Sequence, residues 1–408
     1  MENIKHIAAK ELKVGMYVFD LNSAWGPDVN IPRKGFIKRN ATIEIIHKLG
    51  IERITIDVDK GIDVDNNINS LHASACNEHH QHHKELQKLG KHTLQITPTE
   101  YLAVEKPRAH RIHTQAKKLV TQLLCDIKMG GAVKVDSIES LANNIMNSII
   151  RNHNALICMG RLRHKDNYLL EHSINVGVMM GLLARSMSFT EAEQEQVIIG
   201  GLIHDIGKTR VPDEILHKPS HLDPLEWDEM KRHIDYGIEV LKDIGSLPKV
   251  TRDVVFHHHE HMDGSGYPQG LKREQISNVG RMSAIVDVYD AITADRDYHD
   301  GMPPTMAMKK LIEWSDKHLD RELVYQFIRC MTIYPGGSLV EVDNHLLAIV
   351  DEANLMKQDC PVVRIIYDAQ QMRPVSERTI DLSKEGVKEK IVRSVDPKDY
   401  NLQLSQFI

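Results

Sequence analysis

The residues of this sequence that could do chemistry are histidines and aspartates, and the densest group of them ends an apolar, helix-like segment. The run Gly201-Leu202-Ile203-His204-Asp205-Ile206-Gly207-Lys208 places an imidazole, a carboxylate and an ammonium group within a few positions. Successive residues of a helix are about 100° apart around its axis, so His204 and Asp205 point to different sides and could serve two metal ions. We expect the Asp205 carboxylate to bridge them.

Further imidazoles and carboxylates recur along the chain, each on or at the end of a predicted helix: His172, His233, His258, His259 and Asp287. Asp287 and Asp290 both lie in an apolar helical segment, where an unpaired carboxylate would be costly to bury, so a cation or a hydrogen-bond partner is expected nearby. Helical bundles build polynuclear metal centres in this way, from imidazoles and carboxylates that point inward. Nitrogen and oxygen donors without sulfur suit iron or manganese and allow zinc.

Such a centre predicts chemistry on phosphorus. Two ions roughly 3.5–4 Å apart with a shared hydroxide drive in-line attack on a phosphate and stabilise the leaving oxygen. Lys208 follows the His204-Asp205 pair by one helical turn and could hold a phosphate oxygen as a point charge. We therefore expect Asp205 and Lys208 to act directly in the reaction.

Helical patterns that could position these residues dominate residues 108–335, which we interpret as the catalytic domain with a connector helix. The pair Asp136 and Glu139 is expected to form a capping box, as are Thr190 and Glu193 at the start of the helix that delivers His204. The other helices are predicted at Arg108–Met129, Asp136–Met159, Tyr168–Met187, Pro224–Ile244, Thr251–His261, Val279–Ala294 and Met306–Tyr334.

The amino-terminal part of the chain has a different pattern. Alternation in Leu12–Val18 and Glu52–Val58, around a helical segment at Ala41–Leu49, predicts a small α+β regulatory or interaction domain over residues 1–65. Residues 66–107 are polar and predict a linker. Its run His79-His80-Gln81-His82-His83 is interpreted as a solvated segment, because no carboxylate or cysteine fixes it as a metal site.

Residues 336–408 predict a β-rich extension. The segments Ser338–Val342, His345–Asp351 and Val362–Asp368 are expected to form a small antiparallel sheet, with Asp343-Asn344 as a turn. The fold class is thus mainly α, with a helical bundle as the catalytic domain, a small α+β domain before it and a small β extension after it.

Composition limits the kinds of binding partner and the cellular compartment that we expect for this protein. A net charge of -6 over 408 residues gives no basic field for duplex nucleic acid. No apolar run reaches the roughly 18 residues of a membrane span, and the start lacks a signal-peptide pattern, so we expect a cytoplasmic protein. The 5 cysteines are scattered without a CxxC, which argues against a disulfide framework.

The motifs that contain these residues resemble those of a known family. From about Asp136 to Val350 the sequence resembles the HD-GYP family of cyclic di-GMP phosphodiesterases, within the HD metallohydrolase superfamily. The motifs that carry the resemblance are His172-Ser173, His204-Asp205-Ile206-Gly207-Lys208, His233 with Gly237, His258-His259-Glu260, Asp263-Gly264-Ser265-Gly266-Tyr267-Pro268 and Asp287. The resemblance implies an HD-type helical bundle that hydrolyses cyclic di-GMP to pGpG or GMP at an iron or manganese centre. Residues 1–65 resemble a small domain of unknown function often found ahead of such domains.

The resemblance also implies roles for single residues. The implied metal ligands are His172, His204, Asp205, His233, His258, His259 and Asp287, with Asp205 bridging, and the implied substrate contacts are Lys208, Tyr267 and Arg296. The run His257-His258-His259 is ambiguous in register, and the following Glu260 and Gly-Tyr-Pro favour 258 and 259 as ligands. The run Asp295-Arg296-Asp297-Tyr298-His299 departs from the family by lacking a proline and a second cation, which bears on substrate affinity and base preference.

The number of metal ions follows from one position. Some members of the family hold a third ion with a glutamate one turn before the first histidine, where this chain has Tyr168. A phenol with a reference pKa of about 10 is a far poorer ligand for a hard cation. Asp166 precedes His172 by six residues and is expected on a different side of the helix. We therefore predict a binuclear centre.

Two alternative functions remain open. The same centre could act on another cyclic dinucleotide, such as cyclic GMP-AMP, or on a nucleotide monoester, since the metal recognises phosphate and only the pocket walls read the base. The chain could also be a non-catalytic cyclic di-GMP receptor, although a complete ligand set argues against this. Protein partners through the amino-terminal domain or the Gly-Tyr-Pro loop, and an oligomer, are compatible with the sequence.

Overall fold

The computed structural model describes residues 4–20, 35–37, 43, 46–47, 51, 53–58, 98–131, 135–162, 168–218, 220–242, 247–295, 301–315 and 317–408. The chain divides into two compact units, residues 1–91 and 92–408, and each is described by itself. The histidine tract at 79–83, Asp166 and Arg296 lie outside the described residues.

The first unit contains a four-stranded antiparallel sheet of order β1-β4-β2-β3. Its strands are β1 (Ile4–Ala8), β2 (Tyr17–Asp20), β3 (Gly35–Phe36) and β4 (Arg53–Asp57). Ile7, Met16, Ile46 and Ile54 are buried between the sheet and a helical segment. The predicted α+β character is confirmed, although the strand expected at Leu12–Val18 begins only at Tyr17. Of the helix expected at Ala41–Leu49, the described residues Ile43, Ile46 and His47 are helical.

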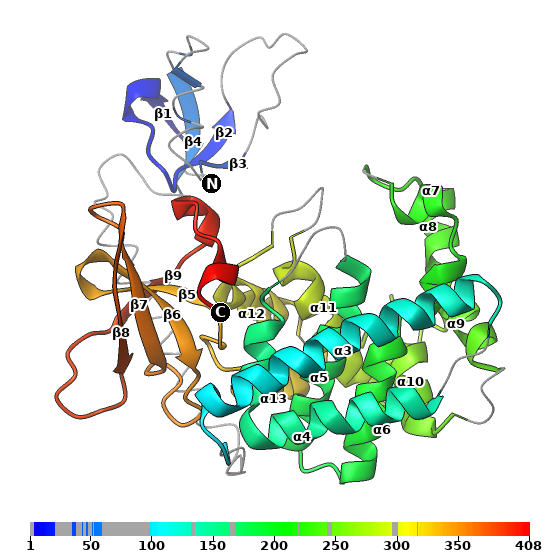
Figure 1. Cartoon of the computed structure of the whole chain (residues 1–408). Helices are drawn as coiled ribbons and strands as arrows, with labels where there is room; N and C mark the ends of the chain where they lie inside the picture. Colours follow the sequence, from blue (N-terminus) through cyan, green and yellow to red (C-terminus); the bar gives the residue numbers. More distant parts are fainter. Residues whose placement is uncertain are drawn as a thin grey trace. The chain divides into compact units, whose positions relative to one another are not determined.

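The second unit is a helical bundle with a sheet beside it (Figure 1). Its helices are α3 (Leu102–Lys128), α4 (Val135–Met159), α5 (Tyr168–Ser186), α6 (Glu191–Ile203), α7 (Asp213–Leu216), α8 (Pro224–Lys231), α9 (His233–Lys242), α10 (Lys249–His257), α11 (Asn278–Thr293), α12 (Pro304–Trp314) and α13 (Arg321–Met331). Helix α5 is central: it contacts α4, α6, α11 and α13, and every residue from Glu171 to Ala184 is buried. A helix buried on all sides is where a core metal centre can be built.

Helix boundaries follow the predicted caps in part. The capping box of Thr190 and Glu193 is confirmed, since the Glu193 carboxylate accepts from Thr190 N at 2.9 Å and Thr190 Oγ1 accepts from Glu193 N at 3.3 Å. Asp136 lies inside the first turn of α4, so the cap expected there is wrong. The helix expected at Pro224–Ile244 is two helices that part at Arg232.

The helix expected at Met306–Tyr334 is also two helices, α12 and α13. Asp320 starts α13 as its N-cap and accepts a hydrogen bond from Leu323 N at 3.1 Å, a local signal that outweighs the continuous apolar period. The residues between the two helices form a turn that presents His318.

Helix α3 begins six residues before the predicted Arg108, and buried polar contacts hold this first turn in place. Pro107 lies inside α3 and cannot donate a backbone hydrogen bond. Tertiary contacts must therefore stabilise the first turn of this helix. The fully buried Glu105 carboxylate accepts from Ser148 Oγ at 2.6 Å and from Arg151 Nε at 2.6 Å.

A kink in α4 completes this junction. Asn152 has extended backbone angles, with φ of −160° and ψ of 102°, in the middle of the helix. The Arg151 carbonyl is thereby free to accept from Thr99 N at 2.9 Å and from Glu100 N at 3.1 Å. The kink thus lets residues before α3 pair with the backbone of α4.

The carboxy-terminal sheet is antiparallel, with order β8-β7-β6-β5-β9. Its strands are β5 (Leu339–Val342), β6 (Leu346–Glu352), β7 (Val362–Asp368), β8 (Arg373–Asp381) and β9 (Ile391–Ser394). The three predicted strands are confirmed as β5 to β7. The sheet joins the bundle where Asn154 Oδ1 accepts from Ala353 N at 3.0 Å.

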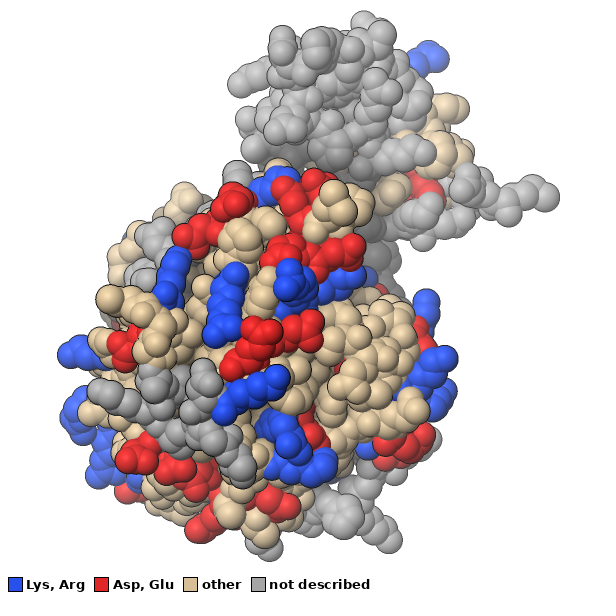
Figure 2. Space-filling model, turned by 90° about the vertical axis from the view of Figure 1, so that its right-hand side faces the viewer, with Lys and Arg blue, Asp and Glu red and all other residues tan. Residues whose placement is uncertain are grey.

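The surface agrees with the absence of a basic field in the sequence. On the face drawn in Figure 2, lysine and arginine side chains alternate with aspartate and glutamate among the described residues. Across the parts of the chain that the structure describes, no helix has the length and apolar character needed to cross a bilayer.

The α3–α4 junction generates a prediction about where the catalytic unit begins. A fragment that starts at Pro98 should fold and bind metal, because it keeps the Glu105 network. A fragment that starts at Arg108 deletes Glu105 and should be strongly destabilised. In the full chain, Glu105→Ala should lower the free energy of unfolding by roughly 2–3 kcal/mol, because Arg151 loses its buried partner.

Thermal unfolding and metal content of both fragments and of Glu105→Ala test this prediction. Glu139→Ala, an exposed glutamate on α4, is the control and should unfold as wild type does. A fragment starting at Arg108 with wild-type stability would show that the first turn of α3 is dispensable.

Candidate metal centre

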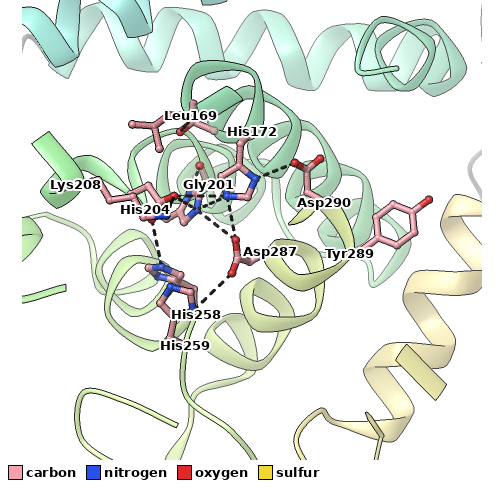
Figure 3. A network of polar contacts seen from close by, with 12 residues as sticks. Leu169, His172, Gly201, His204, Lys208, His258, His259, Asp287, Tyr289 and Asp290 are labelled. Atoms are coloured by element: carbon pink, nitrogen blue, oxygen red, sulfur yellow. Dashed lines mark hydrogen bonds and ion pairs between the residues drawn. The ribbon is translucent and has the colours of Figure 1, made fainter. Parts of the chain in front are cut away.

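The structure brings all the candidate metal ligands together inside the second unit. They come from α5, from the turn between α6 and the short 3-10 helix η3 (Ile206–Arg210), from the start of α9, from the end of α10 and from α11. Figure 3 shows the side chains of His172, His204, His258 and Asp287 pointing toward a common centre. Positions widely separated in sequence thus meet at one buried place.

The ligand atoms form two groups. In the first, His172 Nε2 lies 3.0 Å from Asp287 Oδ1, and His204 Nε2 lies 3.7 Å from the same oxygen. The second contains Asp205, His233, His258 and His259, and the ligand atoms of each group lie within 4.8 Å of one another. Each group has the composition and size to hold one divalent cation.

Asp205 lies between the two groups. Its Oδ2 atom is 3.3 Å from His204 Nε2 and 3.5 Å from His172 Nε2, both of the first group. Its Oδ1 atom faces the second group, 3.6 Å from His233 Nε2 and 3.8 Å from His258 Nε2. This geometry is what a carboxylate shared by two ions requires.

Backbone carbonyls fix the orientation of three imidazoles. The Nδ1–H groups of His204, His233 and His258 donate to Gly201 O at 2.8 Å, Met230 O at 2.7 Å and Val255 O at 2.8 Å. In a neutral imidazole this leaves a lone pair on Nε2, directed at the centre. The three rings are therefore held as ligands.

The donor atoms that face the centre are poorly satisfied without a cation. Asp205 Oδ1, His233 Nε2 and His258 Nε2 are buried and have no hydrogen-bond partner among the described residues. His172 Nε2 and His204 Nε2 lie 3.2 Å apart, a contact that needs a proton or a cation between two lone pairs. Unpaired buried polar atoms are costly, so the residues present fit divalent metal ions.

The charges of the two groups differ. Burial alone would lower the pKa of His204, but the Asp205 and Asp287 carboxylates raise it to about 10. Burial lowers the pKa of His233 to about 4 and that of His259 to about 3. Despite burial, the neighbouring Lys208 and His204 hold the pKa of Asp205 well below its usual range. The carboxylates thus favour positive charge in the first group, whereas burial favours neutral imidazoles at His233 and His259 in the second.

A close backbone contact between η3 and α9 positions Asp205 relative to His233 in the second group. A Cβ atom on Gly207 would lie 1.9 Å from His233 O and 2.3 Å from Gly237 N. Only glycine allows η3 to approach α9 so closely. This approach brings Asp205, two residues before Gly207, to His233.

Comparisons with known proteins agree with the geometry. A family model described as "HD domain" matches residues 146–323, and one described as "Domain of unknown function (DUF3391)" matches residues 4–138. The chain is 32% identical over 393 residues, covering 95% of this chain and 91% of the relative, to "Cyclic di-GMP phosphodiesterase PA4108" of Pseudomonas aeruginosa. The chain belongs to the HD-GYP family of cyclic dinucleotide phosphodiesterases.

Other relatives match a shorter part of this HD-GYP chain. It is 36% identical over 154 residues, covering 38% of this chain and 30% of the relative, to "3'3'-cGAMP-specific phosphodiesterase 2" of Vibrio cholerae. It is 33% identical over 167 residues, covering 41% of this chain and 45% of the relative, to a cyclic di-GMP phosphodiesterase of Thermotoga maritima. The named relatives thus act on more than one cyclic dinucleotide.

Two of the three candidate substrate contacts of this HD-GYP protein lie beside the metal ligands. Lys208 Nζ is 2.6 Å from Asp205 Oδ2, and its side chain is 20% exposed. The Tyr267 ring centroid is 4.7 Å from that of His259, and burial, with Asp287 and Asp205 nearby, raises the pKa of its phenol. Arg296 lies outside the described residues, so its role stays a prediction.

The Gly-Tyr-Pro loop is held by a residue that the sequence did not identify as structural. The buried Glu260 carboxylate accepts from Gln269 N at 2.8 Å and from Leu271 N at 2.9 Å. His257 joins neither ligand group and lies against Gly280, whose missing side chain makes room for it. The structure thus resolves the register of the histidine run as expected, with 258 and 259 in the centre.

The sequence did not identify the partner of the buried carboxylate Asp290, and it gave no role to Trp227. Asp290 Oδ2 accepts from His172 Nδ1 at 2.8 Å and reaches that ring from the side away from the ligands (Figure 3). Its signal was a position one turn after Asp287 on the same helix face. Trp227 of α8 is 47% exposed, and its ring centroid lies 6.3 Å from that of Tyr267. A lone exposed tryptophan gives no such signal in sequence.

Asp290 is a positioning residue, and its removal should weaken metal binding. We expect Asp290→Ala to lower metal affinity by roughly 10–100-fold, because His172 loses the partner that fixes its ring and tautomer. Competition with a chelator of known affinity measures the effect. Asp290→Asn keeps an oxygen acceptor and should lose less; equal affinities in wild type and Asp290→Ala would refute the role.

Proposed function

We propose that this protein hydrolyses cyclic di-GMP to pGpG, GMP or both, at a binuclear iron or manganese centre. The observation that carries the proposal is the position of Asp205 between two ligand groups, with Asp205 Oδ1, His233 Nε2 and His258 Nε2 buried and without a hydrogen-bond partner among the described residues. The relative that matches nearly the whole chain, named a cyclic di-GMP phosphodiesterase, supports the substrate.

The ligand chemistry supports the choice of metal. The first group would hold one ion through His172, His204 and Asp287, the second group would hold the other through His233, His258 and His259, and Asp205 would contact both. Imidazole and carboxylate donors without thiolate suit iron and manganese. Two such ions supply a nucleophile at neutral pH and neutralise charge on the phosphate.

Residues of the chain would then bind and orient the diester. Lys208 is already directed at the centre through its 2.6 Å contact with Asp205. When cations take up the charge of Asp205, the ammonium group is released to pair with a phosphate oxygen. The protonated phenol of Tyr267 is a hydrogen-bond donor at the rim of the same centre.

Two observations bear on the number of ions. The Tyr168 ring stacks on the His172 ring, with centroids 5.5 Å apart and an angle of 13° between the planes. An aromatic ring therefore stands at the position where some family members carry the glutamate that helps to hold a third ion. Within the described residues the clustered ligand atoms form two groups at this centre. Both support the binuclear proposal.

A second candidate substrate is cyclic GMP-AMP. It is favoured by the match to a Vibrio cholerae relative named as specific for 3'3'-cGAMP. The two substrates share the phosphodiester and differ in one base, so the choice between them falls to residues around the centre. Tyr267 presents its ring there, beside His259 and His233, and the ring of Trp227 lies next to that of Tyr267.

The division between metal ligand and phosphate contact can be tested with two variants. Asp205→Ala should lose bound metal and all hydrolysis, because the Asp205 carboxylate faces two imidazoles of each group. Lys208→Ala should keep its metal while its turnover rate falls, because the lysine contacts phosphate. Metal analysis of anaerobically purified protein and chromatography of the products measure both effects.

In the same analysis Asp205→Ala should contain two ions fewer per chain than wild type, because both ions of the centre depend on this carboxylate. A loss of three ions would contradict the binuclear centre, and turnover by Asp205→Ala would contradict the site. Loss of metal from Lys208→Ala would show that the lysine supports the ligands. Rates with cyclic di-GMP, cyclic GMP-AMP and linear pGpG decide the substrate and the product, and binding without turnover of any would favour a receptor.

Trp227 should contribute to recognition of a base. Stacking of a base on an aromatic ring contributes about 1–3 kcal/mol, so Trp227→Ala should raise KM by roughly tenfold or more with little change in kcat. Leu225→Ala is the matched control, since Leu225 is 80% exposed on the same helix and lies off the Tyr267 side. An unchanged KM in Trp227→Ala would remove it from the substrate site.

A further inference from the structure

A second set of metal-binding side chains lies outside the catalytic centre. His261 and Asp263 belong to the loop after α10, and His318 belongs to the turn between α12 and α13. Their ligand atoms lie within 4.8 Å of one another. Each is exposed or half-buried, so the set is open to solvent ions. None of the three is among the candidate ligands of the catalytic centre.

Hydrogen bonds orient His261 as a ligand. The single proton of the Ser265 hydroxyl goes to Asp263 Oδ1 at 2.6 Å, because a carboxylate has no proton to donate. The contact of 3.0 Å between His261 Nδ1 and Ser265 Oγ therefore has the imidazole as donor. A neutral His261 is then left with its lone pair on Nε2, as in the imidazoles of the catalytic centre.

The other two donors face each other without bonding. His318 Nε2 lies 3.7 Å from Asp263 Oδ2, which is too long for a hydrogen bond. The His261 and His318 rings lie side by side, with centroids 4.8 Å apart and 23° between their planes. Two donors on one zinc ion are at most about 4.2 Å apart, so a small closing movement of these side chains suffices.

The backbone around the three residues is held in place. Met262 N donates to His318 O at 2.9 Å, which ties the α12–α13 turn to the loop. An isolated antiparallel bridge pairs Asp263 with Lys272. Gly264 has a φ of 81°, which a residue with a side chain would adopt only with strain. The three ligands therefore project from a frame that exists before any ion binds.

We propose that His261, Asp263 and His318 bind a divalent transition metal ion of the zinc class. Two imidazoles and one carboxylate favour such an ion over calcium or magnesium, which prefer oxygen donors throughout. Three protein ligands leave a position for water, as in open tetrahedral sites. The bound ion joins the α12–α13 turn to the loop that carries Tyr267, and so stabilises that loop.

The stoichiometry of zinc binding tests the proposal in the full chain. Protein stripped of metal with a chelator is titrated with Zn²⁺, and the ions bound per chain are counted in wild type, His318→Ala and His261→Gln. Each variant should bind one ion fewer than wild type. The double variant should also lose one ion and not two, because both residues serve one site.

The control is His345→Ala. His345 is also an exposed imidazole beside a carboxylate, with Nδ1 3.0 Å from Glu341 Oε1, but it has no second histidine. It should bind as many ions as wild type. The rise in melting temperature on adding Zn²⁺ should be smaller in His318→Ala than in His345→Ala.

Hydrolysis separates this site from the catalytic centre. With Mn²⁺ supplied, His318→Ala should keep at least about half of the wild-type kcat, since it removes no ligand of that centre. Equal zinc stoichiometry in wild type, His318→Ala and His261→Gln would overturn the proposal. So would a loss of ions from His318→Ala that is matched by an equal loss from His345→Ala.

Discussion

The constraint on which the rest of this structure depends is the burial of two carboxylates and several imidazoles inside an apolar helical core. Asp205 and Asp287 are 2% and 7% exposed, and the helices that carry or support them are packed on nearly all sides. Charged groups in such a place are tolerated only with opposite charges close by. Cations would satisfy the inward-facing oxygens and nitrogens together, so metal binding and folding of the bundle core would stabilise each other.

A single local device places most of the imidazoles. His204 and His258 are the C-caps of α6 and α10, and His233, the first residue of α9, directly follows Arg232, the C-cap of α8. The last carbonyls of a helix have no partner within it, and each of these histidines donates its Nδ1–H to the carbonyl three residues earlier. His172 lies inside α5, where carbonyls are already used, so it needs Asp290 instead. Helix ends thus set the positions of three candidate imidazole ligands. His172 is the exception, because it lies inside a helix and is oriented by the Asp290 carboxylate instead.

This device also explains how far the sequence could predict the site. The candidate ligands could be recognised in the sequence from their residue types and from their spacing along predicted helices. All seven lie in the centre. The partner of Asp290 could not be named from the sequence, because the contact with His172 is set by the packing of α11 on α5, which no local pattern encodes. The group of His261, Asp263 and His318 depends on the break between α12 and α13, where a cap at Asp320 outweighed the apolar period. Strand β8 was missed because most of its residues are exposed and its alternation is weak.

The proposed roles separate the chemistry on phosphate from the reading of the base. The candidate metal ligands are fixed by helix ends and by glycine contacts in the core, where even a small shift would break several bonds at once. Trp227 and the loop of Tyr267 lie at the rim, and Trp227 meets the centre only through the Tyr267 ring in the ring contacts of the described residues. This chain is similar to relatives named for different cyclic dinucleotides, as expected if substrate preference changes at the rim. A metal ion at His261, Asp263 and His318 would act on that same rim, through the loop and not through the catalytic ligands.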